Sequence, residues 1–250
     1  MHILFLLTVL CLAPATTLLA NEPPAWNYEG DTGPAHWAEL SPDYATCGTG
    51  KNQSPIDIEM KRNVVDAKLP GIKMNYTMLT PQQIINTGHS IEVDMRSGGE
   101  IELDGKTFTL KQFHFHSPSE TLINGESFPM EIHFVHTSDD GELAVVSMLL
   151  MPGAPHPTVD KLWRSLPPEA GLAAELPSWV LKDLEIEKTE KDYFRYNGSL
   201  TTPPCTEGVL WIVLRTPVTV SKPQVEALQA VLGHANNRPV QPLHARKVMK

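Results

Sequence analysis

The sequence has few basic residues, few cysteines and little continuous apolar sequence. Lys and Arg number 20 against 29 Asp and Glu, so the formal net charge is −9 and we do not expect a basic groove for nucleic acid. Beyond residue 20 no apolar run is long enough for a membrane-spanning helix. Internal repeats, low-complexity tracts and Gly/Ser linkers are also missing, which argues against a second domain boundary. These absences favour one sizeable globular domain.

The first twenty residues differ from the rest of the chain. The segment MHILFLLTVLCLAPATTLLA has no acidic residue, Lys or Arg, is too short to cross a bilayer, and ends in small residues near Ala20. We therefore predict a cleaved signal peptide at residues 1–20 and one domain at residues 21–250. Leu10 is bulkier than the residue that usually precedes a lipidated cysteine, so we expect no lipid on Cys11.

Two cysteines remain once this segment is removed. Cys47 and Cys205 are an even pair in a chain expected to reach an oxidising compartment, which favours a disulfide that closes a very long loop. Two buried free thiols are the alternative.

The remaining sequence is typical of a mainly β (α+β) single domain. Residues 23–53, rich in Trp, Gly, Pro and Tyr, indicate an ordered coil that wraps on the body. Turn signals such as Asp104-Gly105 and Asp139-Asp140-Gly141 favour antiparallel neighbours. The β-like runs between turns are Ile72–Tyr76, Gln83–Asn86, Ser90–Met95, Thr107–His116, Met130–Thr137, Leu143–Met151 and Val209–Arg215. We predict a central, mostly antiparallel, twisted β-sheet with a few short peripheral helices.

Two segments have the apolar spacing of short helices. In Thr158–Leu166 the apolar residues fall on one face, and Thr158 is the expected N-cap. Pro223–Leu232 has the same pattern, and Gly233 is the expected stop.

The stretch KQFHFH, which begins at Lys111, places two histidines one residue apart in a run typical of a strand. Because side chains alternate along a strand, His114 and His116 share one face with Gln112, and the two phenylalanines take the other. The phenylalanine face is predicted to be core. The histidine face must meet water, a partner or a metal, and the pair alone does not decide among them.

A third histidine lies in the segment PMEIHFVH, after a connection compact enough to place the two strands side by side. His133 can join His114 and His116 at one point, whereas His136 lies on the opposite face of its strand. Three imidazoles on two stiff strands fit a tetrahedral Zn²⁺ ion that keeps its fourth position for water.

Other metals fit this ligand set less well. A structural zinc site is normally closed by a fourth protein ligand, and the mature chain has no third cysteine to supply one. Copper sites favour an added Cys or Met, and non-haem iron sites replace one histidine by a carboxylate. Zinc is the predicted ion, although the sequence leaves other divalent ions open.

Two polar residues on the histidine faces are candidates to orient the ligands. Gln112 lies two residues before His114, and Glu131 lies two residues before His133. Each can accept the proton on the far ring nitrogen of its histidine. Ordinary polar strand residues are the alternative, which is the simpler interpretation for Gln112 alone.

These segments belong to an ordered series that resembles the α-class carbonic anhydrases, and within them the secreted bacterial type. The series covers nearly the whole mature chain: GPAHW (33–37), KNQSPIDI (51–58), NTGHSIEV (86–93), LKQFHFHSPSE (110–120), PMEIHFVH (129–136), YNGSLTTPPCTEGVLWIV (196–213) and NNRPVQPL (236–243). The resemblance implies zinc-dependent, reversible hydration of CO₂ to bicarbonate and a proton, by attack of zinc hydroxide. It also implies a periplasmic or secreted homodimer that sulfonamide-type anions inhibit.

The resemblance assigns zinc ligation to the same three histidines and adds catalytic residues. Thr201 would accept a hydrogen bond from zinc hydroxide and donate its own proton to Glu120, while its backbone N–H would stabilise the developing bicarbonate oxygen. His89 would be the proton shuttle at the cleft mouth, a role suited to an imidazole with a pKa of about 6.5. Without the motif, His89 would be interpreted as an exposed turn residue.

Further residues match the family pattern around the site. They are Tyr28, Asn86 and Thr202 for the chain of ordered water, Val135, Val145, Leu200 and Trp211 for the apolar wall that receives CO₂, Asn236 for a carbonyl that supports a zinc-bound histidine, and Cys47 and Cys205 for a disulfide that braces the loop of Thr201. We assign no catalytic role to His36, His136, His156, His234 and His244.

Two positions depart from the pattern. Thr121 stands where most members have a histidine after Glu120, and Glu92 stands at a cleft position that is more often Asn or Gln. We expect both changes to affect local stability and the tuning of water or inhibitor binding rather than the reaction. The alternatives to an enzyme are a catalytically silent binding module of this family, which typically loses a zinc histidine, and a zinc-buffering protein, which favours flexible His-rich tracts.

Overall fold

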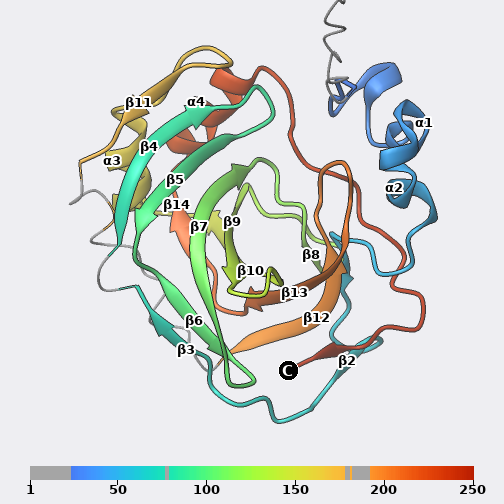
Figure 1. Cartoon of the computed structure of the whole chain (residues 1–250). Helices are drawn as coiled ribbons and strands as arrows, with labels where there is room; N and C mark the ends of the chain where they lie inside the picture. Colours follow the sequence, from blue (N-terminus) through green and yellow to red (C-terminus); the bar gives the residue numbers. More distant parts are fainter. Residues whose placement is uncertain (1–23, 77–78, 178–180, 182–191) are drawn as a thin grey trace, which may run out of the picture.

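A computed structural model of the chain describes residues 24–76, 79–177, 181 and 192–250 (Figure 1). The predicted signal peptide at residues 1–20 lies outside the described residues. Within them, one large twisted sheet dominates and short helices lie at its margin, so the predicted fold class is confirmed. No helix in this part of the chain is both long enough and apolar enough to cross a membrane.

Every run predicted as β overlaps a strand, whereas the seven-residue strand at Tyr193–Ser199 and several shorter strands were not predicted. The strands are β1 (Asp57–Ile58), β2 (Val64–Val65), β3 (Lys73–Asn75), β4 (Thr80–Asn86), β5 (Ile91–Ser97), β6 (Glu100–Leu103), β7 (Lys106–His116), β8 (Leu122–Ile123), β9 (Met130–Ser138), β10 (Leu143–Pro152), β11 (Ala173–Glu175), β12 (Tyr193–Ser199), β13 (Glu207–Leu214), β14 (Val218–Val220) and β15 (Val248–Met249). The helices are η1 (Gly30–Thr32), α1 (Trp37–Leu40), η2 (Pro42–Tyr44), α2 (Thr46–Thr49), α3 (Pro157–Trp163) and α4 (Lys222–Leu232).

The main sheet of the described residues follows the order β11-β4-β5-β7-β9-β10-β13-β12-β15-β2, with β3, β6 and β14 attached to it. Antiparallel pairs connect β4 through β10, as predicted from the turns. β10 pairs in parallel with β13 and β14, because the chain travels through α3, β11 and β12 before it re-enters beside β10. Figure 1 shows β7, β9, β10 and β13 nested at the centre of the molecule.

Apolar side chains pack on both faces of the central strands. On one face, Phe113 and Phe134 are fully buried in a core that also contains Leu162 of α3 and Leu228 of α4. A second, smaller apolar cluster surrounds Trp211. Figure 1 shows α3 and α4 beside β4 and β5, away from α1 and α2.

The segment predicted as an ordered coil at residues 23–53 contains more helical structure than expected. Its described part contains η1, α1, η2 and α2, so the coil interpretation was wrong in part. The turns surround Trp37, which is fully buried and whose indole N–H donates to the carbonyl of Asn27 at 2.9 Å. The predicted disulfide is present, and Cys47 at α2 is joined to Cys205 across a sequence separation of 158 residues.

The start of α3 also differs from the prediction. Its N-cap is His156, whose Nδ1 accepts from the backbone N–H of Val159, and Pro157 occupies the first helical position. The predicted cap, Thr158, therefore lies inside the helix, which ends three residues before its predicted end. α4 stops at Gly233 as predicted, where φ is 75° and only glycine is free of strain.

Candidate active site

The direction of the histidines on β7 depends on one extra residue. Phe108 and Leu110 face the core, but after Lys111 the core positions shift to Phe113 and Phe115. At this point two residues of β7 oppose one residue of β9, which is a β-bulge at the exposed Lys111. The bulge reverses the alternation and turns the two histidines away from the core.

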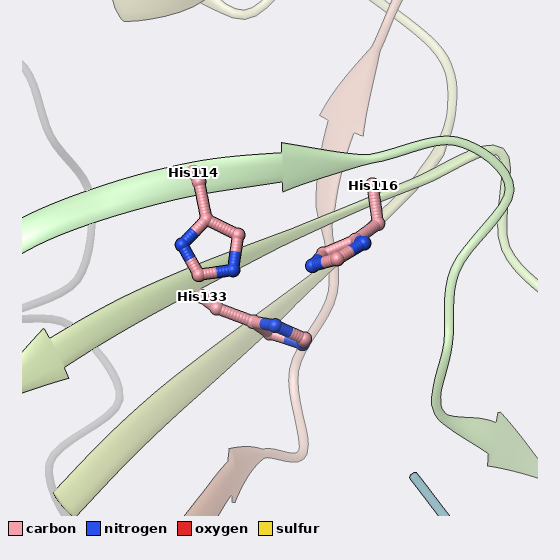
Figure 2. Close-up of side chains that lie close together, drawn as sticks. All are labelled: His114, His116 and His133. Carbon is pink, nitrogen blue, oxygen red and sulfur yellow. The ribbon is translucent and has the colours of Figure 1, made fainter. Parts of the chain in front are cut away.

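The three predicted ligands come together. His114 and His133 are directly opposed across β7 and β9, and His116 follows two residues later on the same face. One ring nitrogen of each histidine lies within 4.8 Å of those of the other two, and Figure 2 shows the rings turned toward a common point. His116 and His133 are buried, and His114 is half-buried.

The outer ring nitrogen of each histidine donates a hydrogen bond to an oxygen. The acceptors are Oε1 of Gln112 for Nδ1 of His114 (2.8 Å), the backbone carbonyl of Asn236 for Nδ1 of His116 (2.7 Å) and Oε1 of Glu131 for Nε2 of His133 (2.9 Å). Since oxygens of this kind accept, the outer nitrogen carries the proton and the inner nitrogen is unprotonated. The three polar residues predicted beside the ligands therefore fix the tautomers.

The chemistry of this cluster fits a cation. Burial, reinforced by the two neighbouring histidines, lowers the pKa of His114 well below its usual value, and burial also lowers the pKa of His116. Nε2 of His116 is buried without a hydrogen-bond partner among the described residues, and an unpaired buried polar atom is costly. Neutral imidazoles with inward lone pairs are what a zinc ion requires.

Glu120 lies against the ligand cluster. Its Oε2 is 3.6 Å from Nε2 of His116 and 3.8 Å from Nδ1 of His133, while its Oε1 accepts from the backbone N–H of Arg238 at 2.8 Å. Burial raises the pKa of Glu120 to about 7, against the lowering effects of His133, Arg238 and a hydrogen bond from the Thr201 side chain. A bound cation would favour the carboxylate form further. Glu120 and Thr201 are both buried.

An apolar wall adjoins the same point. Val135 lies two residues from His133 on β9, pairs with Val145 of β10, and Val145 in turn pairs with Trp211 of β13. The Trp211 ring meets the His133 ring edge-on at 4.9 Å between centroids. Leu200 packs against the same cluster. The four predicted wall residues thus form one surface beside the histidines.

His89 follows β4 in a turn and does not touch the three ligands. Its ring stacks on Trp26 at 3.8 Å between centroids, with the planes 12° apart. Burial lowers its pKa from the usual value, and the nearby His234 lowers it further. Asn236 links the histidine cluster to the His89 turn. Its backbone carbonyl accepts from His116, and its side-chain amide donates to the backbone carbonyl of His89 at 3.0 Å.

The three residues predicted to order water lie around this turn and the Thr201 loop. Tyr28 is buried, and burial followed by the charge of Glu120 raises its pKa well above the usual value. Asn86 accepts from the N–H of Gly88 at 2.9 Å, so its side chain also shapes the His89 turn. Thr202 accepts through its backbone carbonyl from the N–H of Cys205 at 2.8 Å, which ties the loop to the disulfide.

The two departures from the family pattern lie next to the ligands. Thr121 donates its hydroxyl to Oε1 of Glu131 at 2.8 Å. Glu92 of β5 pairs in register with His114, and burial, with help from Asp94, raises its pKa to about 7. Glu92 therefore adds less negative charge to the cleft near neutral pH than its residue type indicates.

Sequence reasoning did not identify three residues of this region. Trp26 stacks on His89, His234 lies near His89, and Ser147 donates to Glu131 at 2.5 Å. Trp26 precedes Tyr28 by two residues, and this spacing points to Trp26 only after Tyr28 has been assigned to the site. Ser147 is the polar residue in the otherwise apolar run LAVVSMLL, and that interruption is a usable signal.

Comparisons with known proteins identify the family of the chain. Residues 32–250 match the family described as eukaryotic-type carbonic anhydrase. The chain is 43% identical over 240 residues to a carbonic anhydrase of Pectobacterium carotovorum, covering 96% of each chain. It resembles the structure of the α-carbonic anhydrase of Thermovibrio ammonificans in complex with the inhibitor sulfanilamide, with 46% identity, a TM-score of 0.85 and coverage of 91% of this chain and 99% of that one.

A second solved structure gives the same result. The α-carbonic anhydrase of Photobacterium profundum is 42% identical, with a TM-score of 0.82 and coverage of 90% of this chain and all of that one. Sequence identity at this level over almost the whole length indicates a shared function as well as a shared fold. The chain therefore belongs to the eukaryotic-type carbonic anhydrase family and is an enzyme of carbon dioxide hydration.

Proposed function

We propose that the protein hydrates CO₂ reversibly to bicarbonate and a proton by means of a zinc ion held by His114, His116 and His133. The observation that carries this proposal is the convergence of three ring nitrogens within 4.8 Å of one another, while each outer nitrogen is bonded to an oxygen. Family membership supports the same reaction.

Three neutral histidines suit this reaction because they leave the charge of the ion intact. When bound, zinc acts as a Lewis acid and lowers the pKa of coordinated water to about 7, the value known for carbonic anhydrase itself. Thiolates or carboxylates in place of the imidazoles would offset part of that charge. Burial keeps His114 and His116 neutral near pH 7, so their inner lone pairs stay available.

Glu120 and Thr201 orient the attacking group. In this proposal the Thr201 hydroxyl donates a hydrogen bond to the carboxylate of Glu120, in line with the lowering effect of the Thr201 side chain on the pKa of Glu120. When the threonine hydroxyl donates in this way, its oxygen can only accept a hydrogen bond from the attacking hydroxide. The backbone N–H of Thr201 is the proposed donor to the developing bicarbonate oxygen.

The apolar wall receives the substrate. CO₂ is small, carries no net charge and is electrophilic at carbon, so it needs a nearby nucleophile more than a strong grip. Val145 and Trp211 are buried, and Val135 and Leu200 pack against them next to His133. Apolar side chains at this position exclude competing water while they leave room for a linear molecule.

The released proton leaves through His89. A histidine whose pKa lies near the working pH accepts and releases protons rapidly. Tyr28, Asn86 and Thr202 are the proposed polar residues that order the water between the metal centre and His89. Trp26 stacks on the His89 ring and holds one orientation of it.

Location, assembly and inhibition form part of the same proposal. We propose that residues 1–20 are removed on export to the periplasm or medium, where the Cys47–Cys205 bridge is stable. A homodimer and inhibition by sulfonamides are proposed from the family, one member of which was solved with sulfanilamide. Fractionation of the host cell, N-terminal sequencing and sedimentation of the mature chain test these points.

The decisive experiment combines metal content with turnover. We expect one zinc per chain and CO₂ hydration in a stopped-flow assay, and His116→Ala should lose both because its buried Nε2 is removed from the cluster. His36→Ala, a substitution of a surface histidine, serves as the matched control and should keep both. Unchanged turnover in His116→Ala would refute the metal assignment. A folded parent protein with zinc but no turnover would instead indicate the catalytically silent binding module.

A further inference from the structure

Glu131 is a fully buried carboxylate with an unusually complete set of donors. Its Oε2 accepts from the backbone N–H groups of Glu120 and Thr121, both at 2.8 Å. Its Oε1 accepts from the hydroxyl of Thr121 at 2.8 Å, from the hydroxyl of Ser147 at 2.5 Å and from Nε2 of His133 at 2.9 Å. The oxygen that orients the histidine is thus itself held by two side-chain hydroxyls.

These two hydroxyls come from separate parts of the fold. Thr121 lies in the loop between β7 and β8, directly after Glu120. Ser147 lies on β10, where it is the register partner of His133 on β9. One carboxylate on β9 therefore joins a ligand, the neighbouring strand and the loop that carries Glu120. Among the described residues, the hydroxyls of Thr121 and Ser147 both bond to Glu131 and neither bonds to a ligand histidine, so both act through Glu131.

We propose that Thr121 and Ser147 are positioning residues of the metal centre, whose hydroxyls fix the Glu131 carboxylate and, through it, the ring of His133. They thereby determine how tightly a zinc ion is retained. The inference rests on the proposed zinc site and adds two residues to it.

The physical argument concerns the freedom of a buried carboxylate. With both hydroxyls present, Oε1 is held between the loop and β10, and the His133 ring can adopt one orientation. Removal of one hydroxyl leaves that oxygen with two donors, the other hydroxyl and His133 itself, so only one side chain besides the histidine then fixes the carboxylate, which gains freedom to rotate. Loss of outer partners of metal ligands typically weakens metal affinity about 10- to 100-fold.

The test measures zinc affinity rather than turnover. Thr121→Val and Ser147→Ala remove one hydroxyl each with little change in volume. We expect each variant to bind Zn²⁺ about 10-fold or more weakly than the parent protein, in competition with a chelator of known affinity. Because both hydroxyls act on one oxygen, the double variant should lose less than the product of the two effects. The absorption spectrum of the Co²⁺-loaded protein should also shift in both variants.

Two control variants separate positioning from general stability. Thr121→Ser keeps the hydroxyl and should bind Zn²⁺ like the parent protein. Ser138→Ala removes a buried hydroxyl at the end of β9, which contacts Asp140 rather than Glu131, and should also leave zinc affinity unchanged. Circular dichroism of each metal-free variant confirms that the fold is retained before affinity is compared.

Parental zinc affinity in folded Thr121→Val and Ser147→Ala would overturn the inference. If Thr121→Val does not fold, Ser147→Ala decides alone, and a parental affinity in that variant has the same meaning. The outcome is distinguishable from failure of the proposed function, since a parent protein that binds zinc without hydrating CO₂ refutes the function and leaves this comparison intact.

Discussion

At the scale of single residues, the proposed exit of the proton depends on His89. We expect His89→Ala to lower kcat about 100-fold in dilute buffer, because proton transfer to solvent then lacks its acceptor. kcat/KM should hardly change, since it reports the steps up to bicarbonate release, which precede the transfer. Added imidazole buffer should restore kcat. Stopped-flow assays at two buffer concentrations measure all three quantities.

The environment of His89 fixes the sign of its pH effect. Burial, followed by the proximity of His234, lowers the pKa of His89, so the neutral acceptor persists to a lower pH than for a free imidazole. The kcat of the parent protein in dilute buffer should therefore decline only below about pH 6.5, the usual value for histidine. His36→Ala is the matched control and should leave kcat in dilute buffer unchanged. A His89→Ala variant with parental kcat in dilute buffer would remove His89 from the mechanism.

At the scale of secondary-structure elements, the β-bulge at Lys111 decides which face of β7 carries the ligands. Deletion of Lys111 forces one half of the strand to reverse its faces. Either Phe108 and Leu110 or Phe113 and Phe115 then leave the core, which should cost about 3–6 kcal/mol of unfolding free energy for two large apolar side chains. Urea unfolding and zinc content measure the loss.

A substitution at the same position isolates the effect of chain length. Lys111→Ala keeps the extra residue and replaces an exposed side chain, so we expect parental stability and one zinc per chain. A deletion variant with parental stability and full zinc content would show that the bulge does not set the orientation of the histidines.

The same bulge shows why part of the site could be predicted and part could not. The alternation of KQFHFH sufficed to place the histidines opposite the phenylalanines, because the pattern begins after Lys111. The reversal itself was not predicted, since Phe108 and Leu110 make an unbroken period of two with His114 and His116. Only the pairing of β7 with β9 reveals the extra residue. Local periodicity predicts which side chains share a face within one regular segment of a strand. The pairing with the neighbouring strand decides whether the next segment keeps or reverses that alternation.

Short elements and remote partners define the other limit of prediction. Two-residue strands such as β2 and β15 have no periodicity of their own and exist because they pair with each other at the sheet edge. The N-cap of α3 was assigned to Thr158 from residue type, whereas the structure uses His156 next to Pro157. Asn236 contacts His116 and Ser147 contacts Glu131 from other segments of the chain, and the family pattern identified only the first of these two residues.

At the scale of the whole molecule, the Cys47–Cys205 disulfide joins α2 near the N-terminus to the loop that carries Thr201. The bridge spans 158 residues, and closure of so long a loop restricts the unfolded chain strongly. We expect the Cys47→Ser/Cys205→Ser double variant to lose about 2–5 kcal/mol of unfolding free energy under oxidising conditions. Urea unfolding of the metal-free proteins measures the difference without a contribution from bound zinc.

A reductant supplies the internal control for this prediction. In excess reductant both the parent protein and the double variant lack the bridge, so their stabilities should converge, and any difference that remains reports the exchange of sulfur for oxygen alone. Because the amide of Cys205 donates to the carbonyl of Thr202, the bridge also holds the Thr201 loop, and hydrogen exchange at the amides of residues 201, 202 and 205 should be faster in the variant. Equal stability under oxidising conditions would contradict the global effect, and unchanged exchange would contradict the local one. The two readouts together show whether the bridge acts mainly on the unfolded chain or also on the loop beside the metal centre.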